Sequence, residues 1–176
     1  MSVIATYARV NEGAIESLRN DSNWLDALFG GKVPDAQVID LDKACDGIVW
    51  LLSRMPPPPA PAGSGSGFIL KQSLASLLSG SGGRKERGLQ APYGPASALT
   101  TEQVKELSNW LSNIEISELR ARYDAEAMAK SHVYPQIWMA EGLAAFEDYL
   151  RPRFSELQKF IARAATGDQS VLVFFT

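Results

Sequence analysis

The chain has 176 residues, 45% of them hydrophobic and 21% charged, and a formal net charge of −3. This length suits one domain with a sizeable core and is too short for two comfortable domains. The acidic balance argues against a general nucleic-acid binder, which usually carries a basic face. No apolar stretch approaches the length of a membrane span. The start, MSVIATYARV, also lacks the basic residues and long apolar run of a signal peptide, so we expect a cytoplasmic protein.

The first part of the chain predicts one strand and two short helices. Residues 2–10 alternate weakly between two sides, which is typical of a strand with at least one buried face. Asn11 can cap a helix that runs to Asn20, and a second helix can follow until the glycine pair at positions 30 and 31 ends it. Residues 36–39 are expected to be extended.

The stretch from Ile39 to Ser53, IDLDKACDGIVWLLS, predicts the helix around which the core forms. Asp40 sits where an N-cap belongs, because its carboxylate can accept N–H groups that the first turn leaves unpaired. Asp42 and Asp46 lie one turn apart on the polar side. There they either form a solvated acidic face that suits the helix dipole or belong to a site. The apolar positions recur at helical spacing and are Leu41, Ala44, Cys45, Ile48 and Leu52.

The only cysteine, Cys45, lies on this apolar stripe, so a disulfide within the chain is excluded. A lone cysteine in such a place usually acts as a small hydrophobic side chain. Neither a histidine partner nor a basic neighbourhood is visible that would make it a thiolate nucleophile.

The composition changes sharply over residues 55–92, which we predict to be a flexible segment within a single domain that spans residues 1–176. MPPPPAPAGSGSG joins a stiff polyproline piece to a flexible one, and residues 79–88 are again rich in glycine. Between them, FILKQSLASLL is apolar enough to form a helix against the body. The glycines lack the spacing of a phosphate-binding loop, which favours plain loops.

Beyond residue 92 the pattern indicates a turn and several helices. After the turn at YGP, Thr100 or Thr101 can start a helix with a capping box. Shorter helices are expected over 117–123 and 124–130, with Asp124 as the cap of the second one and His132 at its end.

The last part of the chain combines a long apolar stripe with a strand. From residue 140 to 165 the apolar positions step by three or four, so Pro152 marks either a kink in one helix or the joint of two helices. The β-prone run VLVFF at 171–175 predicts a strand. We therefore predict an α+β fold, a mostly helical single domain with a small sheet formed by the N- and C-terminal strands. The inward positions of the long stripe are Leu143, Phe146, Leu150, Phe154, Leu157, Ile161 and Ala164.

The central stretch IDLDKACDGIVWLLS resembles the signature of the bacterial YfbM-like family, a domain of unknown function, which typically reads D-L-D-K-A-W-H-G-L-H-[FY]-L-L-[TS]. The resemblance extends in order through TYARV, YGPASALT, VYPQIW and GDQSVLVFF, and covers most of the chain apart from about residues 55–90. One departure matters, because the family's Trp-His-Gly-Leu-His is Cys-Asp-Gly-Ile-Val over residues 45–49. Both histidines are absent, which argues against an activity that needs an imidazole there.

Side chains that could carry chemistry are few. With one histidine, His132, and one cysteine, neither a zinc site nor a Cys-His dyad can be assembled. No Gly-x-Ser-x-Gly elbow supports a serine nucleophile, and we expect a structural role for His132. Asp42 with Asp46 could hold a magnesium ion or perform acid–base work, although such pairs are common on plain helix faces. We assign no catalytic residue, no metal ligand and no cofactor.

Two of the loops that match the family pattern carry an aromatic side chain next to proline, YGP at 93–95 and YPQIW at 134–138. Proline-fixed loops with exposed aromatic residues are places where binding surfaces are often built. A cleft is therefore expected between these loops and the start of the central helix. The candidate binding residues are Asp42, Asp46, Tyr93, Tyr134, Gln136 and Trp138.

These observations favour a non-enzymatic protein-binding domain, most concretely an immunity-type protein that binds and neutralises a toxin enzyme. Acidity supports this interpretation, because inhibitors of enzymes that act on nucleic acid or nucleotides often present carboxylates to a basic cleft. The alternative is a small hydrolase or transferase with a carboxylate-based site near Asp42, Asp46 and the YPQIW loop. A structural or oligomeric domain is the third interpretation. The expected partner is a protein, with no nucleic acid and no membrane.

Overall fold

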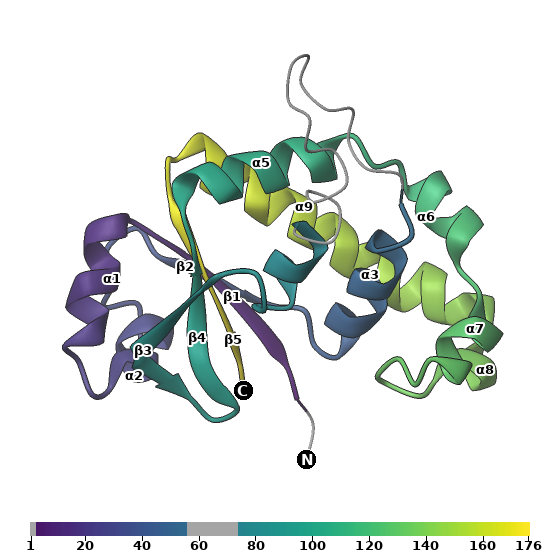
Figure 1. The fold of residues 1–176 in the computed structure, drawn as a ribbon, viewed down its shortest axis with the longest axis horizontal. Helices are drawn as coiled ribbons and strands as arrows, with labels where there is room; N and C mark the ends of the chain where they lie inside the picture. The colour runs from purple at the N-terminus through teal and green to yellow at the C-terminus, as the bar shows by residue number, and fades with distance from the viewer. Residues whose placement is uncertain (1–2, 56–73) are drawn as a thin grey trace.

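The computed structural model describes residues 3–55 and 74–176, and Figure 1 shows how they are arranged. Within these residues, five strands form one sheet in the order β2-β1-β5-β4-β3, and every neighbouring pair is antiparallel. The strands are β1 (Ala5–Val10), β2 (Gln37–Asp40), β3 (Arg84–Ala91), β4 (Gly94–Leu99) and β5 (Ser170–Phe175).

The first and last strands lie side by side, as the sequence predicts. β1 and β5 pair from Ala5 opposite Phe175 to Val10 opposite Ser170. The α+β class is thus confirmed, but the prediction that these two strands alone form the sheet is wrong. β2 has only four residues, and β3, with the sequence RKERGLQA, is mostly polar. Both are edge strands, where charged side chains are common, so their strand signal in the sequence is weak.

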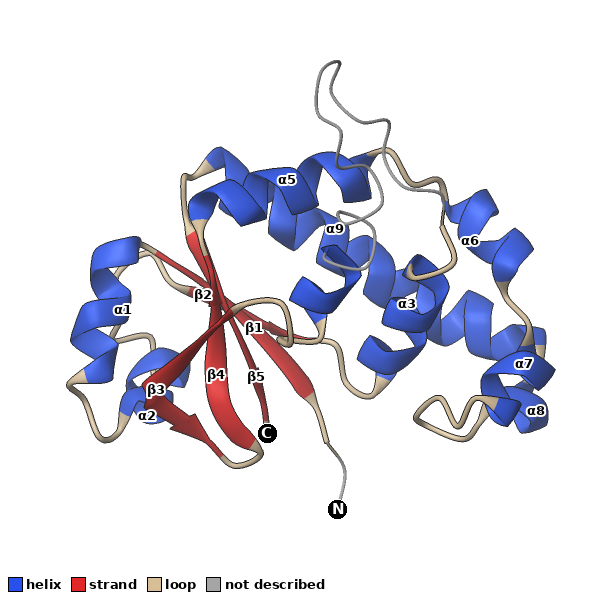
Figure 2. Ribbon diagram, in the orientation of Figure 1, coloured by secondary structure: helices blue, strands red, loops and turns tan. Residues whose placement is uncertain are grey.

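Helices cover both faces of the sheet (Figure 2). α1 (Glu12–Arg19) and α2 (Trp24–Phe29) lie against one face, and the larger group of helices lies against the other. β5 contributes to both cores, because Val173 belongs to the larger core and Leu172 to the smaller one. A strand that is buried on both faces has no polar side, which explains the unbroken apolar run in its sequence.

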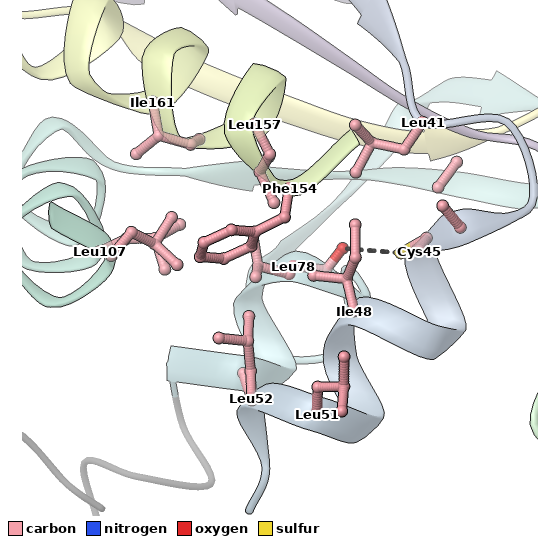
Figure 3. Packing of buried hydrophobic residues seen from close by; sticks show 14 of the residues in the cluster. Leu41, Cys45, Ile48, Leu51, Leu52, Leu78, Leu107, Phe154, Leu157 and Ile161 are labelled. Carbon is pink, nitrogen blue, oxygen red and sulfur yellow. Dashed lines mark hydrogen bonds between the residues drawn. The ribbon is translucent and has the colours of Figure 1, made fainter. Parts of the chain in front are cut away.

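The larger core forms where three helices meet over the sheet. Figure 3 shows the apolar side chains of the central helix directed toward Phe154 and Leu157, with Leu107 beside them. The predicted apolar stripe is confirmed, because each of its five positions is buried. These positions are Leu41, Ala44, Cys45, Ile48 and Leu52. The three helices are α3 (Ala44–Leu52), α5 (Thr101–Ser112) and α9 (Arg151–Thr166).

Two of the helix starts use the predicted caps. Thr100 accepts the N–H of Gln103, whose side chain accepts the N–H of Thr100 in return, so the capping box of α5 is confirmed. Asp124 accepts the N–H of Ala127 at the start of α7. The short helices of this region are α6 (Ile116–Arg122), α7 (Ala125–Lys130) and α8 (Trp138–Glu141).

The long apolar stripe belongs to a helical segment whose hydrogen bonding changes before Pro152. η1 (Ala145–Leu150) is a π-helix that runs directly into α9, and Pro152 is the second residue of α9. The π-helical turn therefore lies where the proline ring would clash with a carbonyl of a regular α-helix. The inward positions are buried except Leu143, which is 47% exposed and precedes η1.

Part of the segment predicted to be flexible has regular structure. Residues 74–78 are helical, which agrees with the end of the predicted helix FILKQSLASLL, and Arg84–Ala91 form β3. The polyproline and GSGSG pieces lie outside the described residues. Over 3–55 and 74–176, no helix is long and apolar enough to cross a membrane.

Candidate functional site

The central helix begins later than the sequence predicts, because the residues before it form a turn. β2 ends at Asp40, whose carboxylate accepts the N–H of Asp42 at 3.1 Å. Asp42 has a left-handed backbone with φ of 50°, and α3 starts only at Ala44. The prediction that Asp40 caps the helix is therefore wrong. Its side chain stabilises the turn instead, which is a common use of aspartate.

Asp42 is held by a tyrosine that comes from η1. The hydroxyl of Tyr149 donates to the Asp42 carboxylate at 3.3 Å and accepts the N–H of Lys43 at 2.9 Å. Burial and the nearby charge of Asp42 raise the pKa of Tyr149, although the N–H of Lys43 acts in the opposite direction. The phenol is therefore protonated at neutral pH, and it fixes the half-buried Asp42 side chain.

Asp46 ties α3 to the loop that precedes α8. Its carboxylate accepts the backbone N–H of Tyr134 at 2.8 Å, and the Asp46 side chain is otherwise exposed. The loop turns at a cis peptide bond between Tyr134 and Pro135. Inside the loop, the indole of Trp138 donates to the carbonyl of Val133 at 2.7 Å. Asp46 thus holds the position of Tyr134 relative to the helix.

An open pocket of about 350 Å³ lies beside the first two turns of α3. We call it the α3 pocket. Its wall combines apolar side chains of three chain segments with two aspartates, one lysine, one serine and Tyr134. The lining residues are Val3, Ala5, Asp42, Lys43, Cys45, Asp46, Val49, Ser79, Tyr134 and Phe175.

Cys45 lies in the wall of the α3 pocket, but its thiol faces the interior. Its sulfur is 3.2 Å from the hydroxyl of Tyr7 and 3.8 Å from the carbonyl of Leu78, and Figure 3 draws the contact with Leu78. Burial raises the pKa of the Cys45 thiol to about 11, even though the hydrogen bond with Tyr7 lowers it. The thiol is therefore neutral at physiological pH and a poor nucleophile.

The structure brings together half of the residues that the sequence predicts as a binding surface. Asp42, Asp46 and Tyr134 line the α3 pocket. Tyr93 is 43% exposed but lies in the β3–β4 turn, outside this lining. Trp138 is fully buried, so it supports the loop from inside.

The last candidate, Gln136, also supports the loop rather than the pocket, because its side chain donates to the carbonyl of Val133 at 3.2 Å. Sequence reasoning missed Val49 and Phe175 as lining residues. Val49 could have been found, because it lies one turn after Cys45 on the same helix. Phe175 was missed although the sequence predicts that the terminal strands share a sheet, because it does not place the end of β5 beside α3.

The side chains that line the α3 pocket offer two carboxylates, an ammonium group, a phenol, the hydroxyl of Ser79 and a neutral thiol that faces the interior. Among the described residues, no three histidine, cysteine, aspartate or glutamate side chains are grouped so that they could hold a metal ion. Such a wall can bind a ligand through apolar contact and through charge.

Fold and pocket define this chain as an α+β protein with helices on both faces of an antiparallel sheet and a small open pocket. The model of the family described as "Domain of unknown function (DUF1877)" matches residues 1–174, so the chain belongs to this family. The resemblance found in the sequence motifs is thereby confirmed.

A solved structure shows the same fold. The crystal structure of YfbM from Escherichia coli, a protein of unknown function, is 13% identical in sequence, with a TM-score of 0.57 over 97% of this chain and 98% of that one. At this identity the likeness shows the fold alone. No curated protein sequence matches the chain.

Proposed function

We propose that this chain is a cytoplasmic, non-enzymatic domain that binds a protein partner through the surface around the α3 pocket. Its most concrete form is an immunity-type protein that binds and neutralises a toxin enzyme. One observation carries the proposal: Asp42 and Asp46 are held by hydrogen bonds from Tyr149 and Tyr134, and both line an otherwise largely apolar pocket. Carboxylates that are already fixed lose little conformational entropy when a partner binds.

The charge of the chain supports this proposal. The formal net charge is −3, and neither Asp42 nor Asp46 forms an ion pair with another described residue. Carboxylates that are not neutralised by an ion pair attract a basic surface and speed its association.

The departure from the family pattern supports it as well. Cys45, Asp46 and Val49 stand where the family pattern has tryptophan and two histidines, and all three line the α3 pocket. In the wall of this pocket, the chain therefore has one carboxylate and one apolar side chain at the positions where the family pattern has two histidines.

A small hydrolase or transferase is the weaker candidate. Such an enzyme needs a group that is free to exchange a proton with its substrate or to attack it. The Cys45 thiol is neutral and faces the interior, and Asp42 and Asp46 are each fixed by one hydrogen bond that leaves lone pairs for a further partner. These contacts favour binding over catalysis.

The test compares two double variants that change the net charge by the same amount. Asp42→Asn with Asp46→Lys changes the pocket, and asparagine suits the left-handed backbone at position 42. Asp21→Asn with Asp26→Lys is the control. It makes the same charge change near α2, where Asp21 accepts one hydrogen bond, from the N–H of Asn23, as Asp42 accepts one from Tyr149, and Asp26 is exposed like Asp46.

Proteins captured from the source organism by the wild type and by each variant are identified, and their binding is measured by calorimetry and stopped flow. We expect the pocket variant to associate about tenfold more slowly and with a weaker salt dependence, because opposite charge acts mainly on the association rate. The control should behave like the wild type. Equal binding by all three proteins overturns the assignment of the surface, and turnover of a small molecule without any protein partner overturns the function.

A further inference from the structure

The α3 pocket has two kinds of surface, and together they specify a ligand. Its apolar part comes from β1, β5 and α3, through Ala5, Phe175 and Val49. Val3 adds an exposed apolar side chain to the same wall. A volume of about 350 Å³ lies near the lower end of ligand pockets, which begin at about 300 Å³. The size therefore suits one side chain or a similarly small apolar group.

The polar part of the wall carries an excess of negative charge. Asp42, Lys43 and Asp46 line the pocket, so two carboxylates stand against one ammonium group. None of these three side chains forms an ion pair with another described residue. A cation that approaches the pocket is therefore attracted, while an anion meets two carboxylates.

We infer that the α3 pocket takes one aromatic or branched aliphatic side chain of the partner, with a lysine or arginine next to it in the partner's sequence. This inference rests on the proposed function, because it names the part of a protein partner that enters the site. The apolar side chain fills the cavity and is desolvated there, as anchor residues of interfaces are. The neighbouring cation then lies against Asp42 and Asp46, whose positions Tyr149 and Tyr134 fix.

The test uses random peptides displayed on phage, selected against the purified full-length chain. Val49→Trp fills the pocket from α3, since Val49 is half-buried and lines it. Val33→Trp is the matched control, because Val33 is also half-buried and lines a groove beside α1 on the other face of the sheet. Val3→Trp is a second filling variant at an exposed position, in case Val49→Trp unfolds.

The enriched peptides should share an apolar side chain next to lysine or arginine. Their affinity, measured with fluorescent synthetic copies, should fall at least about thirtyfold in a folded filling variant and stay unchanged in Val33→Trp. Asp42→Asn with Asp46→Asn should weaken the same peptides about fivefold. No enrichment, enrichment of acidic peptides, or equal binding by the filled variants overturns the inference.

The two proposals fail in different ways. If a captured partner binds the filled variants and the wild type equally, the protein-binding function remains and the pocket chemistry is wrong. If the selected peptides enter the pocket but no protein of the source organism binds the wild type, the proposed function is wrong and the pocket chemistry remains.

Discussion

The two faces of the sheet are held together by different interactions. The helices of the larger core meet through apolar side chains, of which Phe154 and Leu157 are fully buried. On the other face, a buried carboxylate joins β3 to α1. Glu86 accepts hydrogen bonds from Arg19 at 2.7 Å and from Arg84 at 2.8 Å. The smaller face therefore adds buried charge pairing to a smaller apolar core.

A second polar cluster lies at the end of the sheet, where it meets the layer formed by α1 and α2. The side chain of Gln169 accepts from Arg9 at 2.8 Å and donates to the carbonyl of Asp35 at 3.2 Å. Here and at Glu86, buried polar groups are satisfied by partners within the chain, as stability requires. The carboxylates of the α3 pocket form no ion pair with another described residue. This difference is why we assign binding to the α3 pocket and stability to the polar clusters.

The largest expected effect is a loss of core packing. Phe154→Ala should lower the free energy of unfolding by about 3–5 kcal/mol, because it removes a fully buried ring from the larger core. The counterpart on the smaller face is Phe29→Ala. Phe29 is 56% exposed and meets Phe174 only edge-on, so its loss should cost less than about 1 kcal/mol. Urea unfolding followed by circular dichroism measures both, and equal losses would contradict the comparison.

The fold was most predictable where a local pattern matched its surroundings. The stripes of α3 and α9 and the apolar run of β5 face buried environments, so their spacing was informative. β3 was not predictable, because RKERGLQA is polar and its strand conformation depends on pairing with β4. The start of α3 was misjudged for a similar reason. Aspartate favours both caps and turns, and only the structure shows that Asp40 serves a turn.

The site shows the same limit. Asp42 and Asp46 were singled out because helical spacing predicts them one turn apart, but Asp42 lies in the turn before α3. The aromatic loops were a weaker guide, since Trp138 is buried and only Tyr134 of that loop reaches the pocket. Phe175 was missed although the terminal strands were predicted to share a sheet, because the sequence does not show that the end of β5 lies beside α3.

A smaller effect is expected from the charge that holds α1 to β3. Burial alone would raise the pKa of Glu86, but hydrogen bonds and charge from Arg19 and Arg84 outweigh it, so the pKa is lowered. A carboxyl group with a lowered pKa stabilises the fold above its unfolded pKa of about 4.3, and this contribution is lost as the pH falls further. Glu86→Gln should therefore cost about 1–3 kcal/mol at pH 7.

The pH dependence separates this charge effect from a loss of packing. The difference in stability between the wild type and Glu86→Gln should shrink as the pH is lowered from 5 through about 4.3 toward 3, because the wild-type carboxyl group is then protonated as well. Urea unfolding at several pH values measures the difference, with Phe154→Ala as the control whose cost does not depend on Glu86. A constant difference across this range would mean that Glu86 does not act through its charge.

The smallest effects concern two glycines, one in a helix of each face. A Cβ atom at Gly47 in α3 would lie 2.8 Å from the ring of Trp138 and 2.9 Å from a methyl group of Leu150, both fully buried side chains. Overpacking of this kind costs about 1–3 kcal/mol, and the gain in helix propensity of about 1 kcal/mol offsets part of it. We therefore expect Gly47→Ala to lower the free energy of unfolding by up to about 2 kcal/mol. A Cβ atom at Gly13 in α1 would meet no atom within 4 Å, so Gly13→Ala should stabilise the protein by about 0.5–1 kcal/mol. Parallel urea titrations test the opposite signs. Stabilisation by both variants would mean that α3 can move away from Trp138, and that the larger core is looser than its buried contacts indicate.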